Sequence, residues 1–305
     1  PVGPVLAQRA LRDELVAVQV LDERKDGLSR HALEIAPRKV DLLVLLLLLL
    51  VLVCFVFAFG LLWGSFLNVV IHRLPLGESV IAPRSRCPGC RKLITWYQNI
   101  PLLSWLALRA RCANCGMRIS ARYPLVELLT ASLFTLAAWR YPHPEAWLFH
   151  FWFLGAMVAC TFIDIDHWIL PDKITLPGIL IGFTGALMAT EVNWIDSLAG
   201  IAAGGGILYG VAAAYRAYTG KDGLGGGDIK FLAMVGAFLG FKGALTALIL
   251  SSFLGSILGI FLILLRGKKG STAIQFGPFL ALGALAAFFF GEPLWQWYFG
   301  MSEHL

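Results

Sequence analysis

The sequence predicts an all-α integral membrane protein with about eight transmembrane helices and a small zinc-bound loop domain in the cytoplasm. Hydrophobic residues make up 58% of its 305 residues and charged residues only 14%, whereas soluble domains carry about 25% charged residues. Apolar runs long enough to cross a bilayer recur along the chain, and two CxxC pairs occupy one polar loop. The net charge of +6 does not indicate a nucleic-acid partner, because membrane proteins gather Lys and Arg in cytoplasmic loops.

Composition divides the chain into four parts. A polar extension of mixed charge comes first, and no residue in it suggests chemistry. The apolar run from Leu42 to Gly60 is long enough to remain as a membrane anchor, and no small-residue cleavage site precedes Gly64. A polar loop with four cysteines and a polytopic membrane domain follow. The four parts cover residues 1–40, 41–71, 72–123 and 124–305.

Seven further apolar segments predict spans in the last part of the chain. The sixth and seventh of the eight spans are separated only by a Gly-Phe-Lys-Gly turn at 240–243. Glycines within these segments are typical of helices that pack closely in lipid. The expected spans after the anchor are 124–139, 146–163, 174–190, 196–215, 229–241, 243–265 and 274–299.

Positive charge alternates between the connecting segments and predicts their side of the membrane. The loop 72–123 holds nine Lys and Arg residues, and the alternate segments after it hold Lys173, then Arg216 and Lys221, then Arg266, Lys268 and Lys269, whereas each loop between them holds at most one. The N-terminal tail has seven Lys and Arg residues and lies outside against the rule. The segments placed in the cytoplasm are 72–123, 164–173, 216–228 and 266–273.

Two polar segments at the cytoplasmic ends of spans carry aspartates. Asp164 lies in the segment 163–172, and Asp228 ends a glycine-rich run that begins at Gly223. An ionisable side chain at the end of a membrane helix is a functional candidate, because burying its charge is costly. The glycines allow the backbone to approach an extended peptide or another helix closely.

Two aspartates can hydrolyse an amide bond when one is ionised and the other protonated. The ionised carboxylate takes a proton from water, and the protonated one polarises the carbonyl group and assists the leaving amine. Two carboxyl groups that share a proton meet both requirements, because repulsion keeps one of them protonated. Asp164 and Asp228, on different helices at the same depth, can converge in this way.

The neighbouring charged residues have simpler interpretations. Asp166 and Asp172 are interpreted as solvated loop acids or helix caps, and Asp172 occupies the position of an N-cap before a span. Lys230 either pairs with Asp228 or extends to the membrane interface. The glycine run lacks the Gly-Lys-Ser/Thr ending of a phosphate-binding loop.

The four cysteines of the polar loop have the spacing of a zinc site. Cys87 and Cys90 form one CxxC pair, Cys112 and Cys115 form the other, and 21 residues separate the pairs. Four thiolates satisfy tetrahedral zinc and leave no open position, so the expected role is structural. Disulfides are disfavoured in the reducing cytoplasm, and iron or a redox role remains the alternative. Cys54 and Cys160, in apolar runs, are expected to be small buried hydrophobes.

The order of these motifs resembles that of type IV prepilin peptidases, which are bifunctional leader peptidases and N-methyltransferases of the GxGD aspartyl protease group. The resemblance covers the chain from about Gly64 to Pro278. Its landmarks are the two CxxC pairs and the segments Gly64–Pro75 (GSFLNVVIHRLP), Tyr123–Leu128 (YPLVEL), Ile163–Asp172 (IDIDHWILPD), Gly225–Lys230 (GGGDIK) and Phe276–Pro278 (FGP).

The resemblance implies that Asp164 and Asp228 are the catalytic pair, a choice over Asp166 that spacing alone leaves open. It implies a multi-pass protein of the bacterial inner membrane with its active site at the cytoplasmic face. The implied substrates are type IV prepilins and pseudopilins, cleaved after a glycine between a basic leader and a hydrophobic helix. The lipid bilayer is the other expected partner, nucleic acid is not one, and a homo-oligomer is left open.

The resemblance also implies methyl transfer from S-adenosylmethionine to the new N-terminal amine. The sequence contains no glycine-rich nucleotide fingerprint of a soluble methyltransferase. The candidate residues are Glu127, an acid within a span, and Arg73 at the end of the anchor. Arg73 also fits a positive-inside anchor, and Asn68 nearby also fits a contact between helices.

Two other function classes compete with the peptidase. An ion-coupled membrane transporter also uses acids within the membrane and broken helices, but it is expected to show internal repeats, and the two halves show no convincing duplication. A transporter also has no need of a tetracysteine loop. The protein could also be a non-enzymatic assembly subunit, but such a subunit would not need the glycine-rich segment that ends in Asp228.

Overall fold

The computed structural model describes residues 42–188, 191–266 and 275–300, and the predicted N-terminal extension at 1–40 lies outside these residues. Contacts divide the chain into two units, residues 1–55 and 56–305. The described part of the first unit is helical and mostly exposed, as an all-apolar anchor without polar positions should be. This segment opens the helix Leu42–Arg73.

The regular secondary structure in the described part of the second unit is helical, with two isolated β-bridges in the cysteine loop. The all-α fold class is therefore confirmed. The short elements η1 and α2 lie in the cysteine loop and the longer helices follow it, and their bounds are Trp96–Asn99 (η1), Leu103–Ala107 (α2), Arg122–Arg140 (α3), Pro144–His167 (α4), Asp172–Leu187 (α5), Trp194–Thr219 (α6), Gly226–Arg266 (α7) and Gly277–Gly300 (α8).

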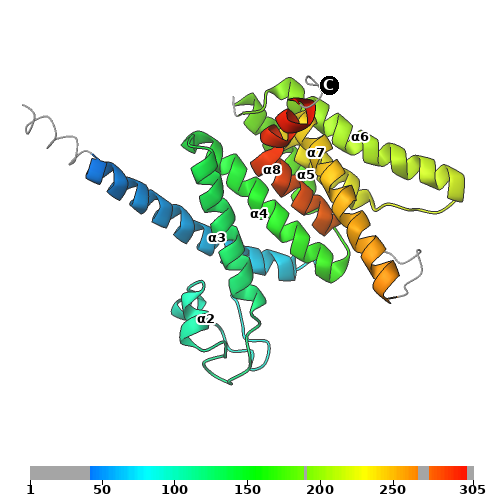
Figure 1. Cartoon of the computed structure of the whole chain (residues 1–305). Coiled ribbons are helices and arrows are strands. Elements are labelled where there is room, and N and C mark those ends of the chain that lie inside the picture. Colours follow the sequence, from blue (N-terminus) through cyan, green and yellow to red (C-terminus); the bar gives the residue numbers. More distant parts are fainter. Residues whose placement is uncertain (1–41, 189–190, 267–274, 301–305) are drawn as a thin grey trace, which may run out of the picture. The chain divides into compact units, whose positions relative to one another are not determined.

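Helix α7 is the centre of the bundle, because it packs against α5, α6 and α8 (Figure 1). Helix α8 also packs against α4, and α4 against α3. The side chains of Phe134, Phe153 and Phe231, one from each of three helices, are fully buried in the shared core. These contacts bring the C-terminal end of α4 and the N-terminal ends of α7 and α8 to one end of the bundle.

Five described helices are long and apolar enough to cross a membrane. They are Leu42–Arg73, Pro144–His167, Trp194–Thr219, Gly226–Leu264 and Gly277–Trp297. Helices α3 and α5 are not among them, and the 16 residues of α5 reach only about 24 Å at 1.5 Å per residue. The count of eight spans therefore stays a prediction.

The predicted division between the sixth and seventh spans falls at a break in α7. Gly240 has φ 69° and ψ −172°, a conformation that interrupts the helix and that a side chain would strain. The carboxylate of Asp196 accepts a hydrogen bond from the backbone N–H of Phe241, where the second half of α7 begins. The break is therefore both allowed by a glycine and capped by an acid from α6.

Helices α6 and α7 approach each other through glycines. A side chain at Gly200 would overlap the carbonyl oxygen of Gly236, and a side chain at Gly204 would meet the backbone of Leu232. The Ser197 hydroxyl donates to the Ala237 carbonyl across the same interface at 2.8 Å. Small residues let the two backbones come close enough for dispersion and hydrogen bonding to hold the helices in lipid.

Replacing Gly200 by alanine should therefore destabilise the protein, although alanine is the better helix former. We expect a cost of about 1–3 kcal/mol, because backbone atoms must move to admit the methyl group. Gly210, on the same helix with open space around it, is the matched control. Thermal unfolding in detergent should show a lower midpoint for Gly200→Ala and an unchanged or higher midpoint for Gly210→Ala. Equal midpoints would contradict the close contact.

Candidate active site

Asp164 lies in the last turn of α4 and is buried, with 6% of its surface exposed. The backbone N–H of Gly277, at the start of α8, donates to its carboxylate. The Gln275 amide donates to the backbone carbonyls of Asp164 at 2.7 Å and Ile165 at 3.1 Å. The helix ends just beyond, where Trp168 takes a left-handed conformation. Helix α8 and the residues just before it thus hold the end of α4 from two positions.

Asp228 lies in the first turn of α7, directly after the glycine run. The backbone N–H of Gly225 donates to its carboxylate, while its own N–H donates to the Gly225 carbonyl at 3.1 Å. A side chain at Gly227 would press on Leu170, which follows α4. The glycines therefore allow the start of α7 to pack against the end of α4, as the sequence predicts.

The structure brings Asp164 and Asp228 together. Their carboxylates lie near enough for the charge on Asp164 to act on Asp228. Both acids sit at helix ends in the same part of the bundle, and each receives one backbone N–H donor. Two carboxyl groups within electrostatic reach of each other repel when both are charged, and a two-aspartate hydrolysis mechanism uses such a pair.

Asp166 and Asp172 differ from this pair because each has a cationic partner. Asp166 pairs with Arg122 at 2.6 Å, and Arg122 also donates to the Phe162 carbonyl at 3.1 Å. Asp172 pairs with Lys230 at 2.7 Å. Among the ion pairs between described residues, none includes Asp164 or Asp228. The geometry therefore separates two structural acids from two that are free for chemistry.

Two expectations about these residues need correction. Of the two interpretations of Lys230, pairing with Asp228 is excluded, because its ammonium group donates to Asp172 on α5 instead. Asp172 is the first residue of α5 and Pro171 is the N-cap, so the acid acts through its charge one position inside the helix. A carboxylate there is favourable beside the partial positive charge of the helix N-terminus.

The four predicted zinc ligands converge. The sulfur atoms of Cys87, Cys90, Cys112 and Cys115 all lie within 4.8 Å of one another. Cys87 Sγ and Cys115 Sγ are 3.7 Å apart, close to the separation of about 3.8 Å that two sulfurs have around a tetrahedral zinc with Zn–S bonds of about 2.3 Å. The cluster can hold a metal ion, and its donor set and dimensions fit zinc.

The two CxxC turns repeat the same backbone pattern. The N–H of Cys87 donates to the Lys92 carbonyl, and the N–H of Cys112 donates to the Met117 carbonyl, at 3.0 and 2.8 Å. The residue after the second cysteine of each pair is left-handed, and Gly116 takes this conformation without strain. Each turn therefore presents both of its sulfurs to one point.

Backbone donors prepare one of the sulfurs for a metal. The N–H groups of Cys115 and Asn114 point at Cys112 Sγ and lower the pKa of this thiol to about 6. A thiolate is the form that binds zinc, so the backbone favours the ligand state of Cys112, whereas burial and the neighbouring cysteines raise the pKa of Cys115 to about 11 without a metal. Of the two single cysteines, Cys160 is buried as predicted, whereas Cys54 is exposed along with most of the described anchor segment 42–55.

The methyl-transfer candidates make structural contacts. Glu127 is buried and accepts a hydrogen bond from the backbone N–H of Leu102 at 2.8 Å and another from Ser65. Leu102 has a positive φ of 60°, so this bond holds an unfavourable backbone conformation in the cysteine loop. Arg73 donates to the Ser79 carbonyl at 3.0 Å. Among the hydrogen bonds and ion pairs between described residues, none joins Glu127 to Arg73.

Sequence reasoning missed Gln275 and the role of Gly277. The Phe-Gly-Pro segment is a landmark of the sequence, but its spacing gives no hint that it reaches Asp164, because Gly277 follows Asp164 by 113 positions. The absent side chain of Gly277 is required, since a Cβ there would lie 2.6 Å from Asp164 Oδ2.

Comparison with known proteins decides the family. A model of the bacterial peptidase A24 N-terminal domain matches residues 58–141, and a model of the type IV leader peptidase family matches residues 151–260. A prepilin leader peptidase/N-methyltransferase of Aeromonas hydrophila is 42% identical over 267 residues, which cover 80% of this chain and 92% of the relative. The chain belongs to the type IV leader peptidase family.

Other members of this leader peptidase family are similarly close. A protein of the same description from Myxococcus xanthus is 44% identical over 224 residues, covering 70% of this chain and 64% of the relative. One from Pseudomonas aeruginosa is 37% identical over 269 residues, covering 78% of this chain and 90% of the relative. No solved structure matches the chain.

Replacing Gly277 by alanine should impair the leader peptidase without unfolding it. The added methyl group must displace the Asp164 carboxylate and weaken its bond to the Gly277 N–H, so we expect kcat to fall about tenfold or more, as misplaced catalytic groups do. Gly291, on the same helix with open space where a side chain would begin, is the control position. Leader cleavage and thermal unfolding should be measured for both variants. Wild-type cleavage by Gly277→Ala would argue against this contact.

Proposed function

We propose that the chain is a membrane aspartyl endopeptidase that removes the basic leader of prepilins after a glycine and then methylates the new N-terminus. The observation that carries the peptidase is the convergence of Asp164 and Asp228 at helix ends, where neither forms an ion pair with another described residue. Membership of the leader peptidase family supports the substrate class and the second activity.

The geometry supports a simple division of labour between the two acids. The ionised carboxylate takes a proton from a water molecule, which attacks the scissile carbonyl carbon. The protonated carboxyl group donates a hydrogen bond to the carbonyl oxygen and afterwards gives its proton to the leaving amine. The backbone N–H groups of Gly277 and Gly225 orient the two carboxylates.

We place this reaction at the cytoplasmic face of the bacterial inner membrane. Five helices able to cross a membrane support the membrane location, and the basic loop 72–123 supports the side. Pseudopilins are proposed as further substrates, since they share the basic leader and hydrophobic helix. The bundle contacts lipid on its outer surface, and a homo-oligomer is a further proposal. An ion-coupled transporter is not favoured.

The cysteine cluster is proposed to hold structural zinc. Bound there, zinc would tie the two CxxC turns together and add nothing to peptide hydrolysis, because four thiolates fill its coordination shell. Methyl transfer draws its methyl group from S-adenosylmethionine, and we propose Glu127 and Arg73 as residues that serve it. Both lie within the part of the chain matched by the N-terminal domain model.

A direct test uses purified protein and a synthetic substrate with a basic leader, a glycine and a hydrophobic helix. Mass spectrometry should find cleavage after the glycine and, with S-adenosylmethionine present, a mature product heavier by one methyl group. Variants that lack one aspartate of the pair should still methylate a pre-cleaved substrate, because the two reactions use different groups. An intact substrate after incubation with folded protein would contradict the function.

A further inference from the structure

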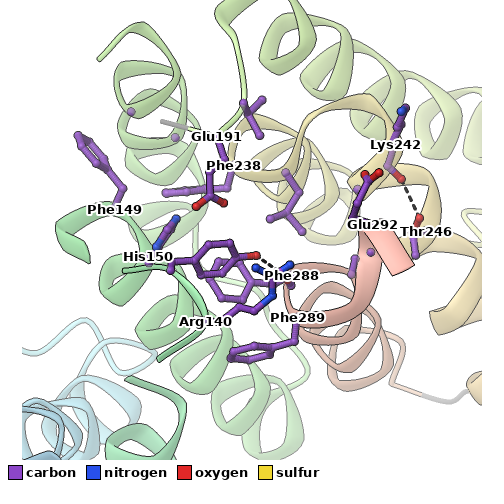
Figure 2. A pocket seen from close by; sticks show the side chains of 18 of the residues that line it. Arg140, Phe149, His150, Glu191, Phe238, Lys242, Thr246, Phe288, Phe289 and Glu292 are labelled. Carbon is purple, nitrogen blue, oxygen red and sulfur yellow. Dashed lines mark hydrogen bonds between the residues drawn. The ribbon is translucent and has the colours of Figure 1, made fainter. Parts of the chain in front are cut away.

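Figure 2 shows a cavity of the bundle, whose volume is about 600 Å³ and whose lining residues do not include the two aspartates. His150 lines it on α4, fourteen residues before Asp164, which corresponds to about 21 Å along the helix. The ends of α3 and α5, the segment before α6, the break in α7 and the second half of α8 complete the wall. Its volume is that of an ordinary small-molecule site, which ranges over about 300–1,000 Å³.

A buried imidazole nitrogen in this wall has no partner. His150 is 7% exposed, and its Nδ1 atom is buried without a hydrogen bond in the described structure. The ring is held by aromatic contacts, 4.7 Å from the Tyr141 ring and 5.2 Å from the Phe288 ring. Buried polar atoms are normally paired, so this nitrogen offers a hydrogen-bond position to a guest in the cavity.

Opposite charges enter the same cavity without pairing directly. Arg140 and Glu191 both line it, and the charges of Arg140 and His143 act on Glu191, yet no ion pair between described residues joins Arg140 to Glu191 within 4.0 Å. The Arg140 guanidinium is held over the Tyr141 ring at 5.0 Å. Figure 2 shows Arg140, His150 and Glu191 directed into one hollow. The cavity therefore offers a cation, an anion and an acceptor to a single guest.

The other charged groups of the wall have their own contacts. Asp196 accepts from the Phe241 N–H, and Glu292 accepts from the Gln296 amide at 2.9 Å. Lys242 lies over the Trp295 ring at 5.6 Å, and His143 lies 3.5 Å from Glu145. We assign Arg140, His150 and Glu191 to the ligand, and Lys242, which like Arg140 is a cation held over an aromatic ring, is a second cation of the wall.

We propose that this cavity binds a phosphoethanolamine headgroup, with its ammonium against Glu191 and His150 Nδ1 and its phosphate against Arg140. A zwitterion matches a site that keeps its own charges apart, and an ammonium supplies the donor that a neutral imidazole nitrogen accepts. The membrane lipid is the nearer source, because the site lies at a bundle end whose wall includes Tyr141 and Trp295, the residue types that gather at the level of the headgroups. The inference does not depend on the peptidase activity.

The test measures lipid binding by native mass spectrometry of the full-length protein in detergent. Short-chain phosphatidylethanolamine, phosphatidylcholine and phosphatidylglycerol with identical acyl chains are compared. We expect at least a fivefold preference for phosphatidylethanolamine, because the quaternary amine of choline has no N–H and phosphatidylglycerol has no cation. Soluble O-phosphoethanolamine is the second arm. If O-phosphoethanolamine binds at this site, the headgroup chemistry is supported and the natural source is a soluble one. If phosphatidylethanolamine binds and O-phosphoethanolamine does not, the source is the membrane lipid.

Variants locate the site. Glu191→Gln should abolish the preference for ethanolamine over choline, and Arg140→Gln should weaken binding of all three lipids by at least fivefold. Glu145→Gln, at the same bundle end but outside the cavity wall, should bind as the wild type does. Unchanged leader cleavage and unfolding midpoints show that the variants fold. No preference among the three lipids, or a preference that survives Glu191→Gln, would overturn the proposal.

Discussion

Replacing Asp164 or Asp228 by asparagine should abolish leader cleavage, with a loss of at least about 10³-fold for either variant. A positioned general acid or base contributes about 10²–10⁴-fold, and the mechanism requires both at once. Asparagine keeps the size and the acceptor oxygen for the Gly277 or Gly225 N–H, but it neither takes nor gives a proton. Product masses at several time points measure the loss.

Asp166→Asn and Asp172→Asn are the matched controls for this experiment. Asp166 and Asp172 lie in the same segment as Asp164, and each substitution removes one negative charge. The ion pairs of Asp166 with Arg122 and of Asp172 with Lys230 are partly exposed to solvent. Such pairs contribute about 0–1 kcal/mol to stability, so both variants should fold and keep a substantial part of the activity. Robust cleavage by Asp228→Asn, or equal losses in all four variants, would sink the two-aspartate mechanism.

Removing the cysteine cluster should have the second large effect, on metal content and on the fold of the loop. Purified protein should carry one zinc per chain, and replacing Cys87 and Cys112 together by serine should reduce this to near zero. Each CxxC turn then keeps a single ligand. In small zinc-binding peptides, zinc contributes roughly 10–16 kcal/mol of apparent free energy to folding. Packing within a loop of this size cannot replace that contribution.

The loss of zinc should also expose the loop to protease. Between the CxxC pairs the only helical elements are the short η1 and α2, which contain no buried residue. Limited proteolysis should therefore cut the double variant within the loop 72–123 and spare the wild type. Cys54→Ser, outside the cluster, serves as the control for cysteine loss. A zinc-free wild type with four reactive thiols and a protease-resistant loop would refute the structural metal.

Much of the architecture could be predicted because its causes are local. Apolar runs long enough to span lipid must form helices, since a helix satisfies its own backbone hydrogen bonds there. The break at Gly240 could be predicted from the sequence, because glycine tolerates the backbone conformation that ends a span. The CxxC pairs likewise form tight turns by themselves, so their spacing predicted the cluster that the structure contains.

The partners of individual charges could not be predicted, because they come from distant segments. Lys230 is two residues from Asp228 in sequence, yet its side chain reaches Asp172 on another helix. The sequence presents Glu127 as an acid within a span, and the structure gives it the Leu102 N–H. A polar residue in a membrane span indicates a functional or structural role, but the sequence does not show which group it contacts.

The sequence by itself determined that this protein is helical, crosses a membrane, carries a four-cysteine cluster and places aspartates at the ends of two spans. Periodicity, hydropathy and short-range spacing carry that information. Only the tertiary structure decided that Asp164 and Asp228 converge while Asp166 and Asp172 are neutralised by Arg122 and Lys230. Helix packing governs these distances, and it depends on contacts such as Gly277 against Asp164 between residues far apart in the chain.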